Sequence, residues 1–225
     1  MYSSIKLLSL GDCNTLGIVD CQGNAYPERF ARMLNAELCN CGFTMSSLRE
    51  GENFFNAYYD ERVNIITLQY GLVDSWETFK YAPYVLYYPD NIFRKIARKL
   101  AKKYKKICKK LGLNRSLGTA PVLSPEKFSR KLETIKSACR PDTTIFLVET
   151  VPSQDTSRNP AIYAYNKLLE KAAENDQRCL FVPLYEHFDQ NSILYADKTH
   201  INASGHDYIA NKLFESYQKQ TSKHE

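Results

Sequence analysis

Two short stretches at opposite ends of the chain carry residue types suited to nucleophilic chemistry. An apolar run at 4–10 ends in a glycine, and Cys13 follows at a predicted strand-to-helix turn, where the helix dipole favours a thiolate. Asp197 precedes His200 by three residues, directly before another predicted helix. A carboxylate at this spacing can orient an imidazole that acts as a base. Taken singly, the first motif is more typical of a small core cysteine, and the second of a surface histidine at a helix start.

The elements that must position these residues follow from the hydrophobic pattern. Apolar and β-branched runs predict buried strands, and three- and four-residue apolar spacing predicts helices. The predicted strands are 4–10, 63–70, 144–150 and 179–184, and the predicted helices are 27–38, 159–169 and 204–217. Strands that alternate with helices predict an α/β fold with a parallel sheet, whose sites collect at the carboxyl ends of the strands.

Length and composition place the chain among soluble globular proteins. It has 225 residues, of which 44% are hydrophobic and 24% charged, and no apolar run approaches the roughly 18 residues of a spanning helix. We therefore expect a cytoplasmic protein. The seven cysteines are an odd number without paired metal-site spacing, so we expect free thiols, no metal and no cofactor.

The positive charge is concentrated in one segment. Residues 91–115 hold eleven Lys or Arg and no Asp or Glu, so the remaining chain has a formal charge of −6. Apolar residues at helical spacing predict a basic amphipathic helix over 92–111. This helix is either an ordinary packed crossover or a surface for a polyanion or an anionic membrane, such as the inner membrane face. Nucleic acid is disfavoured because no recognised motif accompanies the charge.

An aromatic segment, 76–90, precedes the basic helix. It includes Tyr84, Tyr87 and Tyr88, whose flat apolar faces and hydroxyl groups suit sugars. We expect it to act as a lid or substrate platform, or to pack the basic helix onto the domain.

Four segments together resemble, in order and spacing, the blocks of the SGNH (GDSL-like) hydrolases. They are Gly11-Asp12-Cys13, Asn40-Cys41-Gly42, Gly71-Leu72-Val73-Asp74 and Asp197-x-x-His200-x-Asn202-x-x-Gly205. The resemblance covers residues 4–218 except a departure around 77–140. It implies a three-layer α/β/α sandwich with a flavodoxin-like, five-stranded parallel sheet, hence one domain over 1–225 with a Tyr-rich and basic helical insertion at about 77–140.

The resemblance also implies a role for each matching residue. Cys13 stands at the position of the nucleophile, and its N–H would be one oxyanion donor. Gly42 would supply the second donor, His200 the general base, and Asp197 the group that orients the base. Asp74 matches a supporting position beside the substrate.

Two residues depart from the family pattern. Cys13 replaces the nucleophilic serine, and Val73 replaces the asparagine that would be the third oxyanion donor, a loss that costs about 10² to 10³ in rate in other enzymes. Either a cysteine nucleophile, which needs less activation, tolerates the weaker oxyanion hole, or another donor, such as Asn14 or an amide in the insertion, replaces the asparagine.

These residues lead to two functional expectations. The first is a hydrolase or acyltransferase that uses a Cys-His-Asp triad on an ester or acyl bond, such as that of an acylated glycan or a cell-surface polysaccharide precursor. The alternative is a catalytically inactive SGNH-like binding protein that uses its basic helix. The sequence makes no prediction of oligomeric state.

Overall fold

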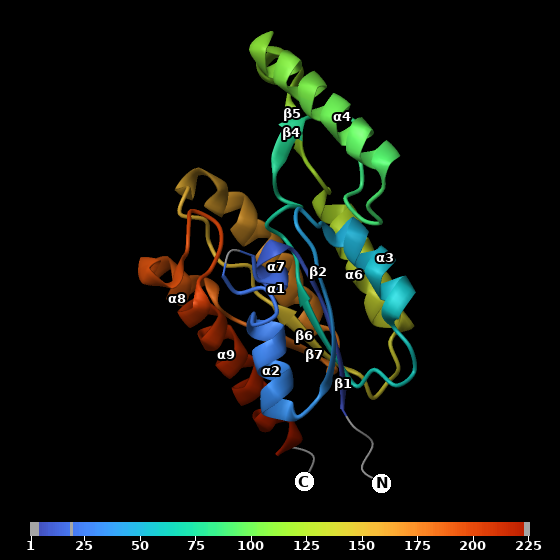
Figure 1. Cartoon of the computed structure of the whole chain (residues 1–225), viewed down its shortest axis with the longest axis vertical. Helices are drawn as coiled ribbons and strands as arrows, with labels where there is room; N and C mark the ends of the chain where they lie inside the picture. The colour runs from blue at the N-terminus through green and yellow to red at the C-terminus, as the bar shows by residue number, and fades with distance from the viewer. Residues whose placement is uncertain (1–4, 19, 223–225) are drawn as a thin grey trace.

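A five-stranded parallel sheet forms the centre of the computed structural model, which describes residues 5–18 and 20–222 (Figure 1). Its strands are β1 (Lys6–Gly11), β2 (Glu37–Gly42), β3 (Ile65–Gln69), β6 (Thr144–Val148) and β7 (Cys179–Val182). They lie in the order β2-β1-β3-β6-β7, which is the flavodoxin-like order. The predicted fold class is confirmed. Residues 1–4, 19 and 223–225 of the predicted domain, including the first residue of its first predicted strand, lie outside the described residues.

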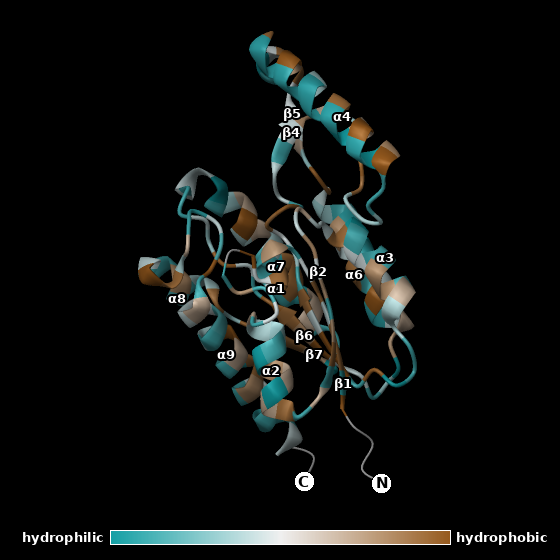
Figure 2. Ribbon diagram, in the orientation of Figure 1, coloured by the Kyte–Doolittle hydropathy of each residue, from teal (hydrophilic) through white to brown (hydrophobic). Residues whose placement is uncertain are grey.

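Helices cover both faces of the sheet and make a three-layer sandwich. One layer contains α3 (Leu48–Tyr58), α6 (Pro125–Ala138) and α7 (Asn159–Glu174), and the other contains α2 (Tyr26–Leu34) and α9 (Ala203–Thr221). The side chains of β1 alternate between these layers, since Leu8 and Leu10 pack toward α3, α6 and α7 while Leu7 packs toward α2 and α9. Burial on both faces explains the hydrophobic central strands in Figure 2.

The strand order places a crevice above β1 and β3. The chain crosses from β1 to β2 on one side and later continues to β3 on the other, so the connections diverge at the carboxyl ends of these strands. Such a divergence is the usual ligand site of an open α/β sheet. The short helix α1 (Cys13–Leu16) begins there, directly after β1.

An arm formed by residues 77–121 projects from the sandwich (Figure 1). Its elements are β4 (Glu77–Phe79), α4 (Ile92–Lys110), α5 (Leu113–Leu117) and β5 (Thr119–Pro121), with β4 and β5 paired antiparallel. The insertion predicted at 77–140 is thus too long, because α6 packs within the sandwich and is the crossover helix between β3 and β6. The basic helix is a feature of the arm.

The predicted first helix, 27–38, also has a wrong boundary. It ends at Leu34 because Asn35 adopts a left-handed conformation (φ 50°) that terminates the helix. Leu38 therefore belongs to β2.

Three further short helices, η1 (Thr156–Arg158), α8 (Tyr185–Gln190) and η2 (Ser192–Leu194), lie in the connections before α7 and α9. Within the described ranges, no helix is both long and apolar enough to cross a membrane. The seven cysteines are free thiols.

Candidate active site

Cys13 is the first residue of α1, at the carboxyl end of β1. The turn needs glycine before it, because a Cβ on Gly11 would lie 1.9 Å from the Thr15 hydroxyl oxygen. Asp12 caps α1 by accepting the N–H of Asn14 at 2.9 Å. Cys13 itself is 5% exposed and packs with Leu72. The thiol is thus held at the switch point of the sheet but is covered by apolar side chains.

The electrostatic surroundings of Cys13 differ from the sequence expectation. Burial, followed by the negative charge of Asp12, raises the pKa of the Cys13 thiol well above its ordinary value. The helix dipole does not offset these effects, since α1 has only one turn. Burial also raises the pKa of Asp12, to about 6. The resting form of Cys13 is therefore the neutral thiol, not the predicted thiolate.

Asp197 and His200 form a hydrogen-bonded pair on the loop before α9. The His200 Nδ1 lies 2.7 Å from Asp197 Oδ2, while Asp197 Oδ1 accepts the N–H groups of Thr199 at 2.7 Å and of His200 at 2.8 Å. The bonds to the backbone fix the carboxylate, and the carboxylate fixes the ring. The second ring nitrogen of His200 is left to accept a proton.

Asn14 connects the two ends of the chain at this site. Its side-chain amide donates to the Thr199 carbonyl at 3.3 Å and accepts the Ile201 N–H at 3.2 Å. These bonds tie the loop of His200 to the helix of Cys13, although no direct hydrogen bond joins the Cys13 sulfur to the His200 ring in the described chain. Asn14 thus positions the loop and does not direct its amide toward a substrate. The expectation that Asn14 is a donor to the substrate is therefore wrong for this conformation.

The predicted second oxyanion donor is engaged elsewhere. The Gly42 N–H donates to Asn40 Oδ1 at 2.8 Å, so it is not free to bind an oxyanion in this conformation. Gly42 is instead required for close packing, because a Cβ at this position would lie 2.3 Å from the Leu16 nitrogen.

Asp74 supports the site from below. It is fully buried, and its two carboxylate oxygens accept the N–H groups of Leu48 at 2.9 Å and Gly71 at 3.0 Å. Burial raises the pKa of Asp74 to about 7. The residue joins the end of β3 to the start of α3 and, being fully buried, does not reach a substrate.

A cavity of about 210 Å³ lies between the sandwich and the arm. Val73 and Trp76 line it from the sandwich, Tyr84 and Tyr87 from the aromatic segment, and cationic side chains from α4. Tyr88 does not line it, because its ring stacks on Phe54 with centroids 3.8 Å apart. The predicted aromatic platform therefore exists beside Val73, with Tyr88 serving to pack it onto α3.

Glu50 on α3 holds the aromatic segment in place. This buried carboxylate accepts the Tyr84 hydroxyl at 2.9 Å and the Tyr87 N–H at 2.8 Å. The Tyr84 hydroxyl is thus already satisfied. Both tyrosines line the cavity, and an arginine lies over one face of each ring, with Arg49 at 4.6 Å from the Tyr84 centroid and Arg98 at 4.8 Å from the Tyr87 centroid.

Two residues beside the site, Arg158 and Met45, were not predicted from the sequence. The Arg158 side chain donates to the Leu72 carbonyl at 2.8 Å and lies 4.8 Å from the Trp76 ring centroid, and its positive charge acts on both Asp12 and Cys13. It precedes a helix in a stretch without periodicity, so no pattern marks it. Met45 lines the cavity and has a φ of 59°, a conformation usual for glycine. No sequence signal indicates that strained backbone.

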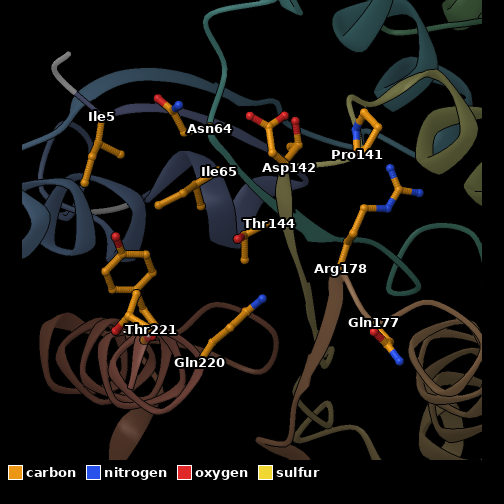
Figure 3. Close-up of a pocket in the computed structure, with 12 residues that line it drawn as sticks. Ile5, Asn64, Ile65, Pro141, Asp142, Thr144, Gln177, Arg178, Gln220 and Thr221 are labelled. Carbon is orange, nitrogen blue, oxygen red and sulfur yellow. Dashed lines mark hydrogen bonds between the residues drawn. The ribbon is translucent and has the colours of Figure 1, made fainter. Parts of the chain in front are cut away.

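A larger cavity, of about 520 Å³, lies at the opposite end of the sheet (Figure 3). Its lining includes Ile65 and Thr144, the first residues of β3 and β6. Its arginine, Arg178, is bound to Asp176 and to nearby carbonyl groups. The described lining contains neither histidine nor cysteine, so this cavity lacks the groups that the carboxyl edge brings together.

Comparison with solved structures finds close matches to the whole fold. A lipolytic G-D-S-L family protein from Veillonella parvula matches with a TM-score of 0.62 and 14% identity, over 94% of this chain and 97% of that chain. An acetylxylan esterase from Geobacillus stearothermophilus, solved as a catalytic mutant, matches with a TM-score of 0.60 and 16% identity, over 96% of this chain and 95% of that chain. The α/β hydrolase LAE5 from the metagenome of Lake Arreo matches with a TM-score of 0.63 and 17% identity, over 96% of both chains.

Further structures of the acetylxylan esterase are described as catalytic mutants of an aspartate and a histidine three residues apart. No family model and no curated protein matches the sequence. The likeness to solved structures establishes the architecture, and the chain has the fold of the SGNH (GDSL) hydrolases.

Proposed function

We propose that the chain is an SGNH-type hydrolase of ester bonds in which Cys13 is the nucleophile, His200 the general base and Asp197 the residue that orients the base. The observation that carries the proposal is the bonded Asp197–His200 pair on a loop that Asn14 ties to the Cys13 helix. The matched acetylxylan esterase has catalytic aspartate and histidine positions with the same three-residue spacing.

The reaction starts from the neutral thiol. As the Cys13 sulfur attacks the carbonyl carbon of the ester, the free ring nitrogen of His200 takes the thiol proton, and the imidazolium is stabilised by Asp197. The tetrahedral intermediate collapses to a thioester and expels the alcohol, which takes the proton from His200. Water, activated by His200, then hydrolyses the thioester and restores the thiol. An amine or alcohol in place of water would make the same site an acyltransferase.

The negative charge that develops on the carbonyl oxygen requires compensation. The Cys13 N–H has no acceptor in the hydrogen bonds of the described chain, so it is the donor at hand. With Gly42 engaged and Val73 apolar, we assign the remaining stabilisation to the positive charge of Arg158, which already acts on Asp12 and Cys13.

The cavity beside Val73 suggests the substrate class. Tyrosine ring faces with Trp76 suit the apolar face of a sugar or an acyl chain, and the cationic side chains of α4 suit an anionic neighbour group. We propose an acylated glycan, such as a cell-surface polysaccharide precursor. One structural neighbour is named for its action on acetylxylan, which is a glycan ester.

A second candidate is a catalytically inactive binding protein with the same fold. It is favoured by the combination of a buried thiol with a raised pKa, an occupied Gly42 N–H and the apolar Val73. In that case the arm, with its basic helix, would be the working surface.

Hydrolysis of 4-nitrophenyl acetate and of acetylated xylo-oligosaccharides separates the two candidates. If the chain is the proposed enzyme, the wild type turns over substrate and Cys13→Ala does not. Cys13→Ser should retain at least part of the activity, and the matched control Cys39→Ala should be unchanged. Turnover that survives in Cys13→Ala would remove Cys13 from the mechanism. Absence of turnover by the folded wild-type protein on both substrates would favour the binding protein.

A further inference from the structure

Helix α4 exposes an apolar ridge. Seven large apolar side chains of α4 and the residue after it are between 44% and 80% exposed: Ile92, Phe93, Ile96, Leu100, Tyr104, Ile107 and Leu111. At 100° per residue they occupy one arc of about 120° on the helix surface. A ridge of this size on a helix without a partner is uncommon in a soluble domain and marks an interaction surface.

The remaining sides of α4 have different surroundings. Ala101 and Cys108 are buried against the rest of the arm. Ten Lys or Arg and no Asp or Glu occupy the helix, and Lys99, Lys103 and Lys110 border the ridge on one edge. Figure 2 shows hydrophobic and hydrophilic residues alternating along α4, which stands clear of the sandwich.

Arg98 fixes the orientation of α4 on the arm. Its guanidinium donates to the Leu86 carbonyl at 2.9 Å and to Asp90 at 2.5 Å, and lies 4.8 Å from the Tyr87 ring centroid. These contacts bind the side of α4 opposite the ridge to the aromatic segment. The ridge is consequently turned away from the protein, except at its edge, where the Tyr104 ring lies 6.2 Å from that of Phe79.

We propose that α4 docks the protein on an anionic phospholipid bilayer, with the ridge in the headgroup region and the bordering lysines on the lipid phosphates. An amphipathic helix with an apolar face and a lysine-rich edge lies in the plane of such an interface. Charge complementarity selects this partner over a second copy, because two copies of α4 would bring ten positive charges against ten. A nucleic acid would use the lysines but would leave the ridge exposed.

The docked orientation has a consequence for the cavity. Lys102 and Lys105, on the side of α4 away from the ridge, line the cavity together with Arg98. A bilayer bound to the ridge is therefore separated by α4 from the cavity that Val73 lines. The docking itself does not depend on the proposed hydrolysis, since none of the ridge residues lines that cavity.

Vesicle flotation tests the proposal on the full chain. The probes are vesicles of phosphatidylcholine alone and vesicles with 30% phosphatidylglycerol, at low and at high salt. We expect binding only to the anionic vesicles, weakened by salt. Ile96→Ser with Leu100→Ser should reduce binding at least tenfold. Reversal of Lys99, Lys103, Lys106 and Lys110 to Glu should reduce it at least 100-fold, since each basic residue near the surface contributes about fivefold.

Matched controls carry the same changes elsewhere. Ile193→Ser replaces an 81% exposed apolar side chain far from α4, and four reversals at Lys127, Arg130, Lys171 and Lys219 repeat the change in net charge. Both should bind as the wild type does. Circular dichroism confirms that every variant is folded.

Three results would overturn the proposal. In the first, the wild type fails to float with anionic vesicles at low salt. In the second, the serine variant binds as well as the wild type, which would leave a polyanion such as nucleic acid as the partner. In the third, the protein dimerises through the ridge, seen as a mass by light scattering that falls to a monomer in the serine variant.

Discussion

The carboxyl edge of the sheet and the arm differ in how they accommodate their side chains. At the carboxyl edge the buried polar groups are paired within the protein, as Asn14 and Asp74 illustrate. In α4 the large apolar groups face solvent, as Phe93 does with 80% exposure. The first region pairs its polar groups internally, and we have proposed an external partner only for the second. The aromatic segment held by Glu50 and Arg98 joins them, so the cavity has one wall from each region.

The largest effect on activity should follow the loss of the proposed base at the carboxyl edge of the sheet. His200→Ala should lower kcat/KM for 4-nitrophenyl acetate by about 10³-fold, because the imidazole is the base proposed to take the thiol proton. The matched control is His187→Ala, which removes a ring that stacks on Tyr208 at 3.8 Å and leaves Asp197 untouched. Equal losses in both variants would mean that the assay reports folding and not the base.

The next largest effect concerns the folding stability that Asp74 contributes at the carboxyl edge of the sheet. Asp74→Ala should lower the free energy of unfolding in urea by about 3 kcal/mol, because two buried N–H groups lose their acceptor. Asp142→Ala, which removes an exposed carboxylate, should change it little. If the two variants unfold at the same urea concentration, the joint between β3 and α3 does not depend on Asp74.

The same carboxyl group should make stability depend on pH. Its pKa is raised to about 7 in the folded protein, so its contribution to stability is present below the ordinary aspartate pKa and is lost as the pH rises toward 7. Relative to Asp74→Asn, the wild-type free energy of unfolding should fall between pH 4 and 7 by up to about 1.4 kcal/mol per pH unit. A constant difference across this range would contradict the buried, partly protonated carboxyl.

A smaller effect should appear at the thiol. Asp12 ionises at about pH 6, and above that pH its negative charge raises the pKa of Cys13. Asp12→Asn retains the helix cap but removes this charge. Alkylation of Cys13 at pH 8 should become about tenfold faster, as expected for a thiol pKa lower by one unit. Mapped alkylation rates at Cys39 provide the internal control. A slower reaction at Cys13 would show that Asp12 assists the thiol.

The smallest effect is expected in the arm. Leu100→Ser should leave the free energy of unfolding within about 0.5 kcal/mol of the wild type, since the side chain is 64% exposed. Leu10→Ser in β1, which is fully buried, should be strongly destabilising in the same assay. A large loss from Leu100→Ser would mean that the ridge already packs within the protein.

The sequence predicted the sandwich better than the arm for a physical reason. Strands buried on both faces, such as β3 and β6, carry continuous apolar runs that few other structures produce. The periodicity of α4 predicts a helix equally well, but it does not tell whether the apolar face meets the protein or an external partner. Helices α3 and α6 were not predicted, although both bury apolar residues at helical spacing, such as Phe128, Leu132 and Ile135 in α6.

Prediction of the site reached the residue types but not all of their contacts. Cys13, Asp197 and His200 stood out only together with the other segments, whose order and spacing resemble the SGNH blocks. The bond from Gly42 to Asn40 depends on the local backbone geometry, and the action of the Arg158 charge on Cys13 depends on how two distant segments fold together. Such contacts leave no local signal in a single sequence.

The most direct test of a catalytic Cys13 is the covalent intermediate. The protein is mixed with 4-nitrophenyl acetate, quenched in acid within a turnover and mapped by peptide mass spectrometry. The account predicts an acetyl group on Cys13 in the wild type and its slow formation in His200→Ala. Acetylation of Cys13 at equal rates in both proteins, or none at Cys13 while substrate is being hydrolysed, would contradict it.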